Sequence, residues 1–258
     1  MEVILNHAGK YFKAHLDEPL DISLPLTSGK SGVKCFYAPN FEATPVVSGN
    51  FIGSTRHGGV VNFVDVKINP HGNGTHTECV GHISKEERNI NETLKTYHFI
   101  AELVSVYPKT ESNGDRVITL NDLQKVFKNS NKCDALIIRT IPNLLEKKEF
   151  NYSGTNPPFI HAKAIEYLVN DCGIKHLIID LPSVDKEQDD GKLDAHKAFW
   201  QYPKTLDLNK TITELVFIDD NIQDGMYLLN LQIASFNIDA SPSKPVLYKI
   251  LPHEFFPF

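Results

Sequence analysis

Short apolar runs with strand character recur along the chain, separated by polar stretches that contain glycine and proline. Two of them, residues 135–139 and 176–181, are almost continuously apolar, which is typical of strands buried on both faces of a sheet. Between them, residues 162–170 show the spacing of an amphipathic helix, with Gly173 as its C-terminal cap. This order of strand, helix and strand predicts a parallel βαβ unit with a right-handed crossover.

Most of the remaining apolar segments also predict strands. They lie at residues 21–26, 60–68, 99–107, 116–120, 214–218, 227–236 and 245–250. Two more helices are predicted, at 122–128 with Asn121 as the cap and at 194–200. Because strands outnumber helices, we expect an α/β protein: one domain over residues 1–258, with a mixed β-sheet core and flanking helices.

The composition fits a globular protein and excludes few functions. The chain has 258 residues, of which 41% are hydrophobic and 22% charged, so it can bury a sizeable core. The net charge of -6 argues against a sequence-independent nucleic-acid binder, which needs a clustered basic face. Without a secretory signal or a long apolar span, we expect a soluble cytoplasmic protein. The four cysteines lack CxxC spacing and predict free thiols.

The densest group of reactive side chains follows the predicted strand at 60–68. His71, His76, Glu78 and His82 combine imidazole and carboxylate, the ligand types that bind zinc, manganese or iron. On a strand, His76, Glu78 and His82 would point to the same face. His71 has the opposite parity, and a bulge among residues 72–74 would bring it to that face. The alternative is a polar loop whose histidines are exposed or hydrogen-bonded.

These residues resemble the signature of the metal-dependent cyclase family, which includes bacterial-type kynurenine formamidase and isatin hydrolase. The signature is His-x-Gly-Thr-His-x-Asp-x-Pro-x-His, and it is matched at Gly74, Thr75, His76 and His82. Glu78 replaces the aspartate and Val80 replaces the proline. His71 stands one residue before the first histidine of the signature, where this chain has Gly72.

The resemblance extends over most of the chain. Residues 20–23 are similar to the family's opening Asp-Ile-Ser strand, and residues 180–185 to its Asp-x-Pro-Ser-x-Asp turn. His196 stands where the family has a histidine ligand, and Glu214, expected to open a strand, where it has a glutamate ligand. The family's fold would be a swivelling β/β/α arrangement.

The resemblance implies a hydrolase that cleaves a small amide, such as an N-formyl arylamine or a cyclic amide, with metal-activated water. It implies one or two divalent ions, zinc or manganese, and the implied ligands are His71, His76, Glu78, His196 and Glu214. The first three would hold one ion, and Glu78 with the last two would hold a second. His82 would be the general acid/base.

Partners follow from the same resemblance. It implies a small-molecule substrate, no nucleic-acid or membrane partner, and a homodimer or homotetramer. Phe36 and Tyr37 are predicted to form an aromatic wall for the substrate.

Two other functions stay open. The irregular signature also fits a metal- or ligand-binding protein of the same fold that has lost catalysis. Residues 27–59 are rich in Gly, Ser, Pro and Asn and predict a long loop, which would suit a cytosolic regulator that binds a partner through it. Metal content separates the first two functions from the regulator, and turnover separates the enzyme from its inactive relative.

Overall fold

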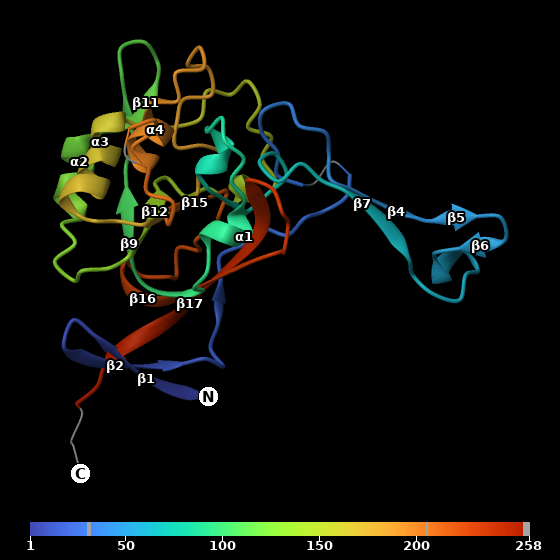
Figure 1. Cartoon of the computed structure of the whole chain (residues 1–258), viewed down its shortest axis with the longest axis horizontal. Helices are drawn as coiled ribbons and strands as arrows, with labels where there is room; N and C mark the ends of the chain where they lie inside the picture. Colours follow the sequence, from blue (N-terminus) through green and yellow to red (C-terminus); the bar gives the residue numbers. More distant parts are fainter. Residues whose placement is uncertain (30–31, 205, 255–258) are drawn as a thin grey trace.

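The computed structural model describes residues 1–29, 32–204 and 206–254, and its central feature is a closed barrel (Figure 1). Seven of the described strands form the ring, because β17 (Ala240–Pro252) pairs with both β16 (Gly225–Ile233) and β8 (His76–Glu78). The other members are β9 (His98–Val106), β12 (Ala135–Thr140), β14 (His176–Ile179) and β15 (Thr211–Glu214). The predicted α/β class and mixed sheet are confirmed, but the closure of the sheet was not predicted.

The barrel combines a parallel part and an antiparallel part. Strands β9, β12, β14 and β15 are neighbours in that order and run parallel. Strands β8, β16 and β17 pair antiparallel and close the ring. His76 and Glu78 of the polar cluster predicted from the sequence lie on β8, so the cluster lies where the antiparallel part meets the end of the parallel part.

Three helices gather on one side of the barrel (Figure 1). They are α2 (Leu120–Val126), α3 (Ala162–Glu166) and α4 (Asp194–Trp200). Helix α3 lies between the parallel strands β12 and β14, which confirms the βαβ unit. It continues as a π-helical turn over Tyr167–Asp171, and Gly173 follows with φ +71°.

The cap predicted for α2 was wrong. Thr119, rather than Asn121, begins the helix, because its side chain accepts from the backbone N–H of Asp122 while the Asp122 carboxylate accepts from the Thr119 N–H. This reciprocal pair is a capping box, which satisfies two donors at once.

Strands β12 and β14 are buried on both faces, as their apolar runs predict. Leu136, Ile138, Leu177 and Ile179 pack outward with Leu123, Ile165, Leu168, Phe199 and Trp200 of the helices. The alternate side chains, Ala135, Ile137 and Ile178, pack with Leu103, Leu229 and Leu247 of other barrel strands. The barrel interior is therefore filled with apolar side chains. Packing of this kind does not explain why polar side chains are buried at the cluster.

Several short elements differ from the prediction. The hairpin of β1 (Glu2–His7) and β2 (Lys10–His15) was missed, and only β3 (Leu20–Asp21) forms where residues 21–26 were expected. A small sheet contains β10 (Lys109–Thr110), β11 (Arg116–Ile118) and β13 (Phe159–Ile160). Helix α1 (Ile90–Thr93) is a single turn. The strand expected at 214–218 is β15, which ends at Glu214 because Leu215 is left-handed at φ +55°.

A two-stranded arm projects from the barrel (Figure 1). It is built from β4 (Glu42–Pro45), the hairpin of β5 (Val47–Ser48) and β6 (Phe51–Ile52), and β7 (Val64–Lys67). The strand expected at 60–68 is therefore shorter, and the predicted long loop contains most of the arm. Residues 30–31 of that loop lie outside the described residues.

None of the helices in the described parts of the chain has the length and apolar character needed to cross a membrane. The four cysteines are free, as predicted.

Candidate metal centre

The six side chains predicted as ligands or acid/base come together at one end of the barrel. His71 lies in the turn before β8, His76 and Glu78 lie on β8, and His82 lies in the turn after it. His196 lies on α4, and Glu214 ends β15. Strand register explains part of this meeting. In the antiparallel pair of β8 and β15, Glu214 lies directly opposite His76.

Glu78 occupies the middle of the cluster. Its Oε1 lies 3.1 Å from Nε2 of His196, and its Oε2 lies 3.1 Å from Nδ1 of His71. The Glu78 side chain is fully buried. A buried carboxylate between two imidazoles can bridge two positive centres, whether these are protons or metal ions.

His76 and Glu214 form the second half of the cluster. His76 Nε2 lies 3.4 Å from Glu214 Oε2. Glu214 Oε1 lies 4.0 Å from Nε2 of His196 and also accepts the backbone N–H of Val184 at 3.1 Å. His196 thus faces both glutamates.

Each of three histidines is anchored through the nitrogen that points away from the cluster. Asp239 Oδ2 lies 2.8 Å from His71 Nε2, Asp185 Oδ2 lies 2.6 Å from His196 Nδ1, and the Gly74 carbonyl lies 2.9 Å from His76 Nδ1. The opposite nitrogens, Nδ1 of His71 and Nε2 of His76 and His196, face the glutamates. Metal-ligating histidines show this pattern, because the outer partner fixes the ring and its tautomer.

Two buried atoms at the centre lack a hydrogen-bond partner among the described residues, His76 Nε2 and Glu78 Oε2. Glu78 Oε2 lies 3.1 Å from His71 Nδ1, and His76 Nε2 lies 3.4 Å from Glu214 Oε2, so each has an oppositely charged group close by. Buried polar atoms rarely stay unpaired. One ligand atom from each of His71, His76 and Glu78 lies within 4.8 Å of the other two, which fits a divalent cation, and imidazole with carboxylate suits zinc or manganese.

The charges in the cluster are strongly coupled. Burial alone would raise the pKa of Glu78, but the neighbouring His82, His196 and His71 lower it. Burial opposes protonation of His71, yet its contacts with Asp239 and Glu78 raise its pKa to about 10. The pKa of His196 is likewise raised to about 10, against the effect of burial, by Asp185 and Glu78. Without a metal, protons therefore balance the buried carboxylates.

The position of His71 has a steric reason. A Cβ on Gly72, the position of the family's first histidine, would lie 2.2 Å from the Ala38 Cβ. A side chain therefore does not fit at this position. The predicted bulge is instead a turn in which the N–H groups of Gly72 and Asn73 donate to the Asn69 carbonyl, and Gly74 follows at φ +125°. This turn brings the His71 ring to the cluster.

His82 reaches the cluster by a different route from the predicted one. Strand β8 ends at Glu78, and His82 closes a 3₁₀ turn over Val80–His82 in which its N–H donates to the Cys79 carbonyl. Its Nδ1 lies 3.8 Å from Glu78 Oε2 and 3.6 Å from Asp239 Oδ2. The ring is partly exposed, unlike those of His76 and His196. His82 is thus positioned between the buried cluster and solvent.

Two anchoring aspartates were not assigned a role from the sequence. Asp185 closes the Asp-x-Pro-Ser-x-Asp turn, and it also accepts the N–H groups of Ala195 and His196 at the start of α4. That motif was a usable signal. Asp239 had no comparable signal, because only the pairing of β17 with β8 brings it beside the cluster.

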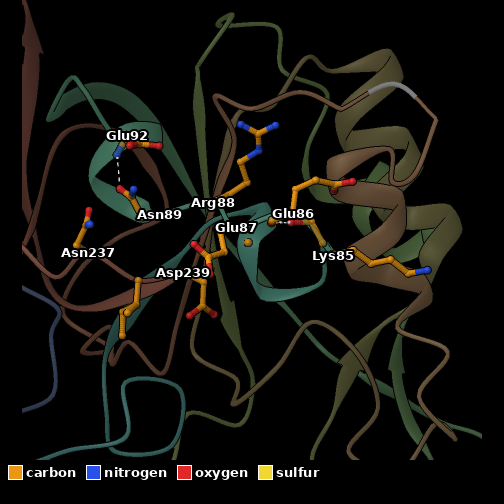
Figure 2. A pocket seen from close by; sticks show the side chains of 11 residues that line it. Lys85, Glu86, Glu87, Arg88, Asn89, Glu92, Asn237 and Asp239 are labelled. Carbon is orange, nitrogen blue, oxygen red and sulfur yellow. Dashed lines mark hydrogen bonds between the residues drawn. The ribbon is translucent and has the colours of Figure 1, made fainter.

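A polar cavity of about 580 Å³ opens beside the cluster (Figure 2). Asp239 forms part of its wall, and so does Gly81, which precedes His82. Two basic side chains, Lys85 and Arg88, line it together with Glu86, Glu87, Glu92 and other polar residues. The partly exposed face of the cluster therefore adjoins a space large enough for a small molecule.

Phe36 and Tyr37 follow a residue that contacts the backbone of His71, but both side chains are exposed. Cys35, the residue before them, contacts the His71 carbonyl through Sγ at 3.3 Å. Phe36 is 41% and Tyr37 73% exposed, and both have left-handed backbone. Their role in binding a substrate stays a prediction.

Solved structures with a similar fold include three hydrolases. Isatin hydrolase A from Labrenzia aggregata is 12% identical with a TM-score of 0.64, and the match covers 90% of this chain and 93% of that chain. Isatin hydrolase A from Ralstonia solanacearum is 11% identical, with a TM-score of 0.63 and coverage of 90% and 91%. A predicted metal-dependent hydrolase from Bacillus stearothermophilus is 17% identical, with a TM-score of 0.61 and coverage of 90% and 98%.

At these identities the likeness shows a shared fold. A comparison with curated protein sequences finds no match. The Cyclase family model matches residues 20–186, more than half of the chain, and this segment includes the turn at 69–82 and the Asp-x-Pro-Ser-x-Asp motif. The chain therefore belongs to the Cyclase family.

Proposed function

We propose that this protein is a metal-dependent hydrolase of small amides, with N-formyl arylamines and cyclic amides as its substrate classes. The observation that carries the proposal is the convergence of three anchored histidines on two buried glutamates, with His76 Nε2 and Glu78 Oε2 left unpaired among the described residues. The isatin hydrolases among the structures of similar fold support the cyclic amide class.

The residues divide into ligands and their supports. His71, His76 and Glu78 would hold one divalent cation, and Glu78, His196 and Glu214 a second. A cation bound there would lower the pKa of a water molecule and polarise the amide carbonyl. Asp239 and Asp185 keep the rings of His71 and His196 in position through their outer nitrogens.

His82 is suited to proton transfer. Hydrolysis adds one water across the C–N bond: its oxygen joins the carbonyl carbon, and the leaving nitrogen gains a proton. His82 is partly exposed, lies close to Glu78 and follows the cavity residue Gly81, so it can pass that proton between the cluster and a substrate in the cavity. Asp239, 3.6 Å from His82 Nδ1, would orient the ring.

The cavity suits a polar substrate or product. Lys85 and Arg88 line it together with Asp239, Glu86, Glu87 and Glu92. Opening of a cyclic amide creates a carboxylate, which the ammonium group of Lys85 and the guanidinium group of Arg88 can bind. The apolar part of a substrate would have to contact residues outside this polar lining, and Phe36 and Tyr37 are the proposed candidates.

The test combines metal analysis with turnover. Protein purified without chelator is expected to contain zinc or manganese by elemental analysis and to lose thermal stability when the ion is removed. N-formyl arylamines and isatin-type cyclic amides would then be assayed with and without added metal. Metal-dependent release of the amine or the ring-opened acid supports the proposal. Bound metal without turnover of either class would favour the inactive relative, and absence of metal binding would refute both.

A further inference from the structure

A second cavity opens at the carboxyl ends of three parallel strands and shares no lining residue with the polar cavity beside the metal cluster. Tyr107 follows β9, Thr140 ends β12, and Leu181 comes soon after β14. Ligands of α/β proteins tend to bind at such strand ends. The volume of about 400 Å³ lies within the range of small-molecule sites. The cavity therefore has the size and the place of a binding site.

The wall of this cavity is mainly apolar and aromatic. Tyr107, Leu144 and Phe150 line it with side chains that are 69%, 57% and 40% exposed. The buried Tyr152 packs edge-on against Phe150, with the ring centroids 4.9 Å apart. The other apolar lining residues are Pro108, Ile141, Pro142, Pro158 and Leu181. Exposed apolar side chains gathered in one concave place favour a ligand with a large apolar group.

Three charged side chains line the cavity, and one of them already has its partners. Lys147 Nζ lies 2.7 Å from Asp180 Oδ2, and it also donates to the carbonyl and the hydroxyl of Thr140. An ammonium group has three donors, and these three acceptors use all of them. Lys147 therefore has no N–H left for a ligand.

The other two charged side chains, Arg116 and Glu146, have no ion-pair partner among the described residues, and they do not pair with each other. The Arg116 guanidinium donates to the Asn156 carbonyl at 3.2 Å, which leaves most of its N–H groups for a ligand. An apolar cavity that presents one cation and one anion is complementary to an apolar molecule that carries both charges.

We propose that this cavity binds a free amino acid with a large apolar side chain, at a site separate from the metal cluster. The Arg116 guanidinium would hold the α-carboxylate, and the Glu146 carboxylate would hold the α-ammonium group. The aromatic wall would contact the side chain of the ligand. None of the candidate metal ligands lines this cavity, so the site depends neither on a bound metal nor on the proposed hydrolase activity.

Molecules with only one of the two charges fit this cavity less well. An apolar carboxylate would leave Glu146 without a cation and would place a second negative charge near it. An apolar amine would do the same to Arg116 with a second positive charge. Like charges brought together in a binding site lower affinity, so both side chains select for the amino acid.

Three ligands with the same aromatic ring separate the two charges. L-Phenylalanine carries both, L-phenylalaninol lacks the carboxylate, and 3-phenylpropionate lacks the ammonium group. Calorimetric titration of the whole chain, as purified, is expected to show one saturable site for L-phenylalanine. The other two ligands should bind at least about tenfold more weakly, because each leaves one charged group of the protein without its partner.

Charge-removing variants locate the site. Arg116→Gln should weaken binding of L-phenylalanine at least about tenfold and should not weaken that of L-phenylalaninol. Glu146→Gln should weaken L-phenylalanine in the same way and should not weaken 3-phenylpropionate. Arg56→Gln and Glu149→Gln remove the same charges at exposed positions outside the cavity, so they are the matched controls and should change nothing.

Leu144→Ser tests the apolar wall and should weaken all three ligands by about fivefold. Leu145→Ser is its control, because the neighbouring Leu145 is 67% exposed and does not line the cavity. Absence of saturable L-phenylalanine binding up to about 10 mM would overturn the proposal. So would equal affinity for all three ligands, or binding that Arg116→Gln and Glu146→Gln leave intact, since the ligand would then lie elsewhere, for example on the metal cluster.

Discussion

The metal cluster and the arm depart from the usual distribution of residues in opposite directions. The cluster buries charged and polar side chains, among them Glu78 and His76, which are inaccessible to solvent. The arm exposes apolar side chains, among them Val60, which is 89% exposed. Folding alone favours neither arrangement, because buried charges and exposed apolar groups both cost free energy. Each region is therefore explained best by something it binds.

The two regions also differ in how the chain holds them. The cluster lies on strands that pair on both sides, since β8 is bonded to β15 and β17. The arm has only the β4–β7 pair and one short hairpin. Substitutions in the cluster should alter chemistry in a rigid frame, and substitutions in the arm should leave the barrel intact.

The largest effect is expected from His76→Ala. This variant removes a fully buried candidate ligand and leaves Glu214 opposite a cavity. In known sites, loss of a residue that only hydrogen-bonds a metal ligand lowers metal affinity by roughly 10- to 100-fold. Loss of a ligand itself should lower the affinity by more than this. Elemental analysis after dialysis measures it. His57→Ala, on the arm, is the matched control and should keep the wild-type metal content. Full metal stoichiometry in His76→Ala would show that the ligand assignment is wrong.

His82→Ala should separate proton transfer from metal binding. Loss of a general acid/base lowers kcat by about 10²- to 10⁴-fold. The candidate metal ligands stay in place, so metal content should remain that of the wild type. Steady-state kinetics on whichever amide the wild type hydrolyses, together with elemental analysis, provides the measurement. Wild-type kcat in this variant would remove His82 from the mechanism.

The pH dependence of the chelated protein tests the charge balance of the cluster. The pKa values of His71 and His196 are raised to about 10 in the folded state, against about 6.5 for an unperturbed histidine. A raised pKa stabilises the fold below about pH 6.5, and this contribution is lost as the pH rises towards 10.

Urea unfolding of metal-free protein should therefore show stability that falls between about pH 7 and about pH 10. His176 does not interfere, because burial lowers its pKa to about 4. Metal affinity should change in the opposite direction, since a cation must displace these protons. A metal-free stability that is flat or rises over this range would contradict the proposed proton balance.

The smallest effect on folding is expected on the arm. Phe63→Ser changes a side chain that is 59% exposed and contacts Phe51 edge-on. The free energy of unfolding of the monomer should change by no more than about 0.5 kcal/mol. Phe127→Ala in the core is the comparison and should cost about 3–5 kcal/mol. A large loss from Phe63→Ser would mean that the arm packs against its own chain.

Sequence patterns identified the parts of the molecule that depend on local chemistry. The apolar runs of β12 and β14 were assigned because both faces of these strands are buried. His71, His76, Glu78 and His82 were found because imidazole and carboxylate side chains gather in a glycine-rich stretch, whereas His196 and Glu214 came from the family resemblance. These features need only side-chain type and spacing, which the sequence contains.

The tertiary structure alone decided how those parts meet. The closure of the barrel depends on β17 pairing with β8 across more than 160 residues, and this pairing also brings Asp239 to His71. Glu214 ends its strand instead of opening it, because a left-handed Leu215 stops β15. The displaced His71 is explained by the missing space at Gly72. Local propensity does not contain such contacts, since each depends on atoms that are distant in sequence.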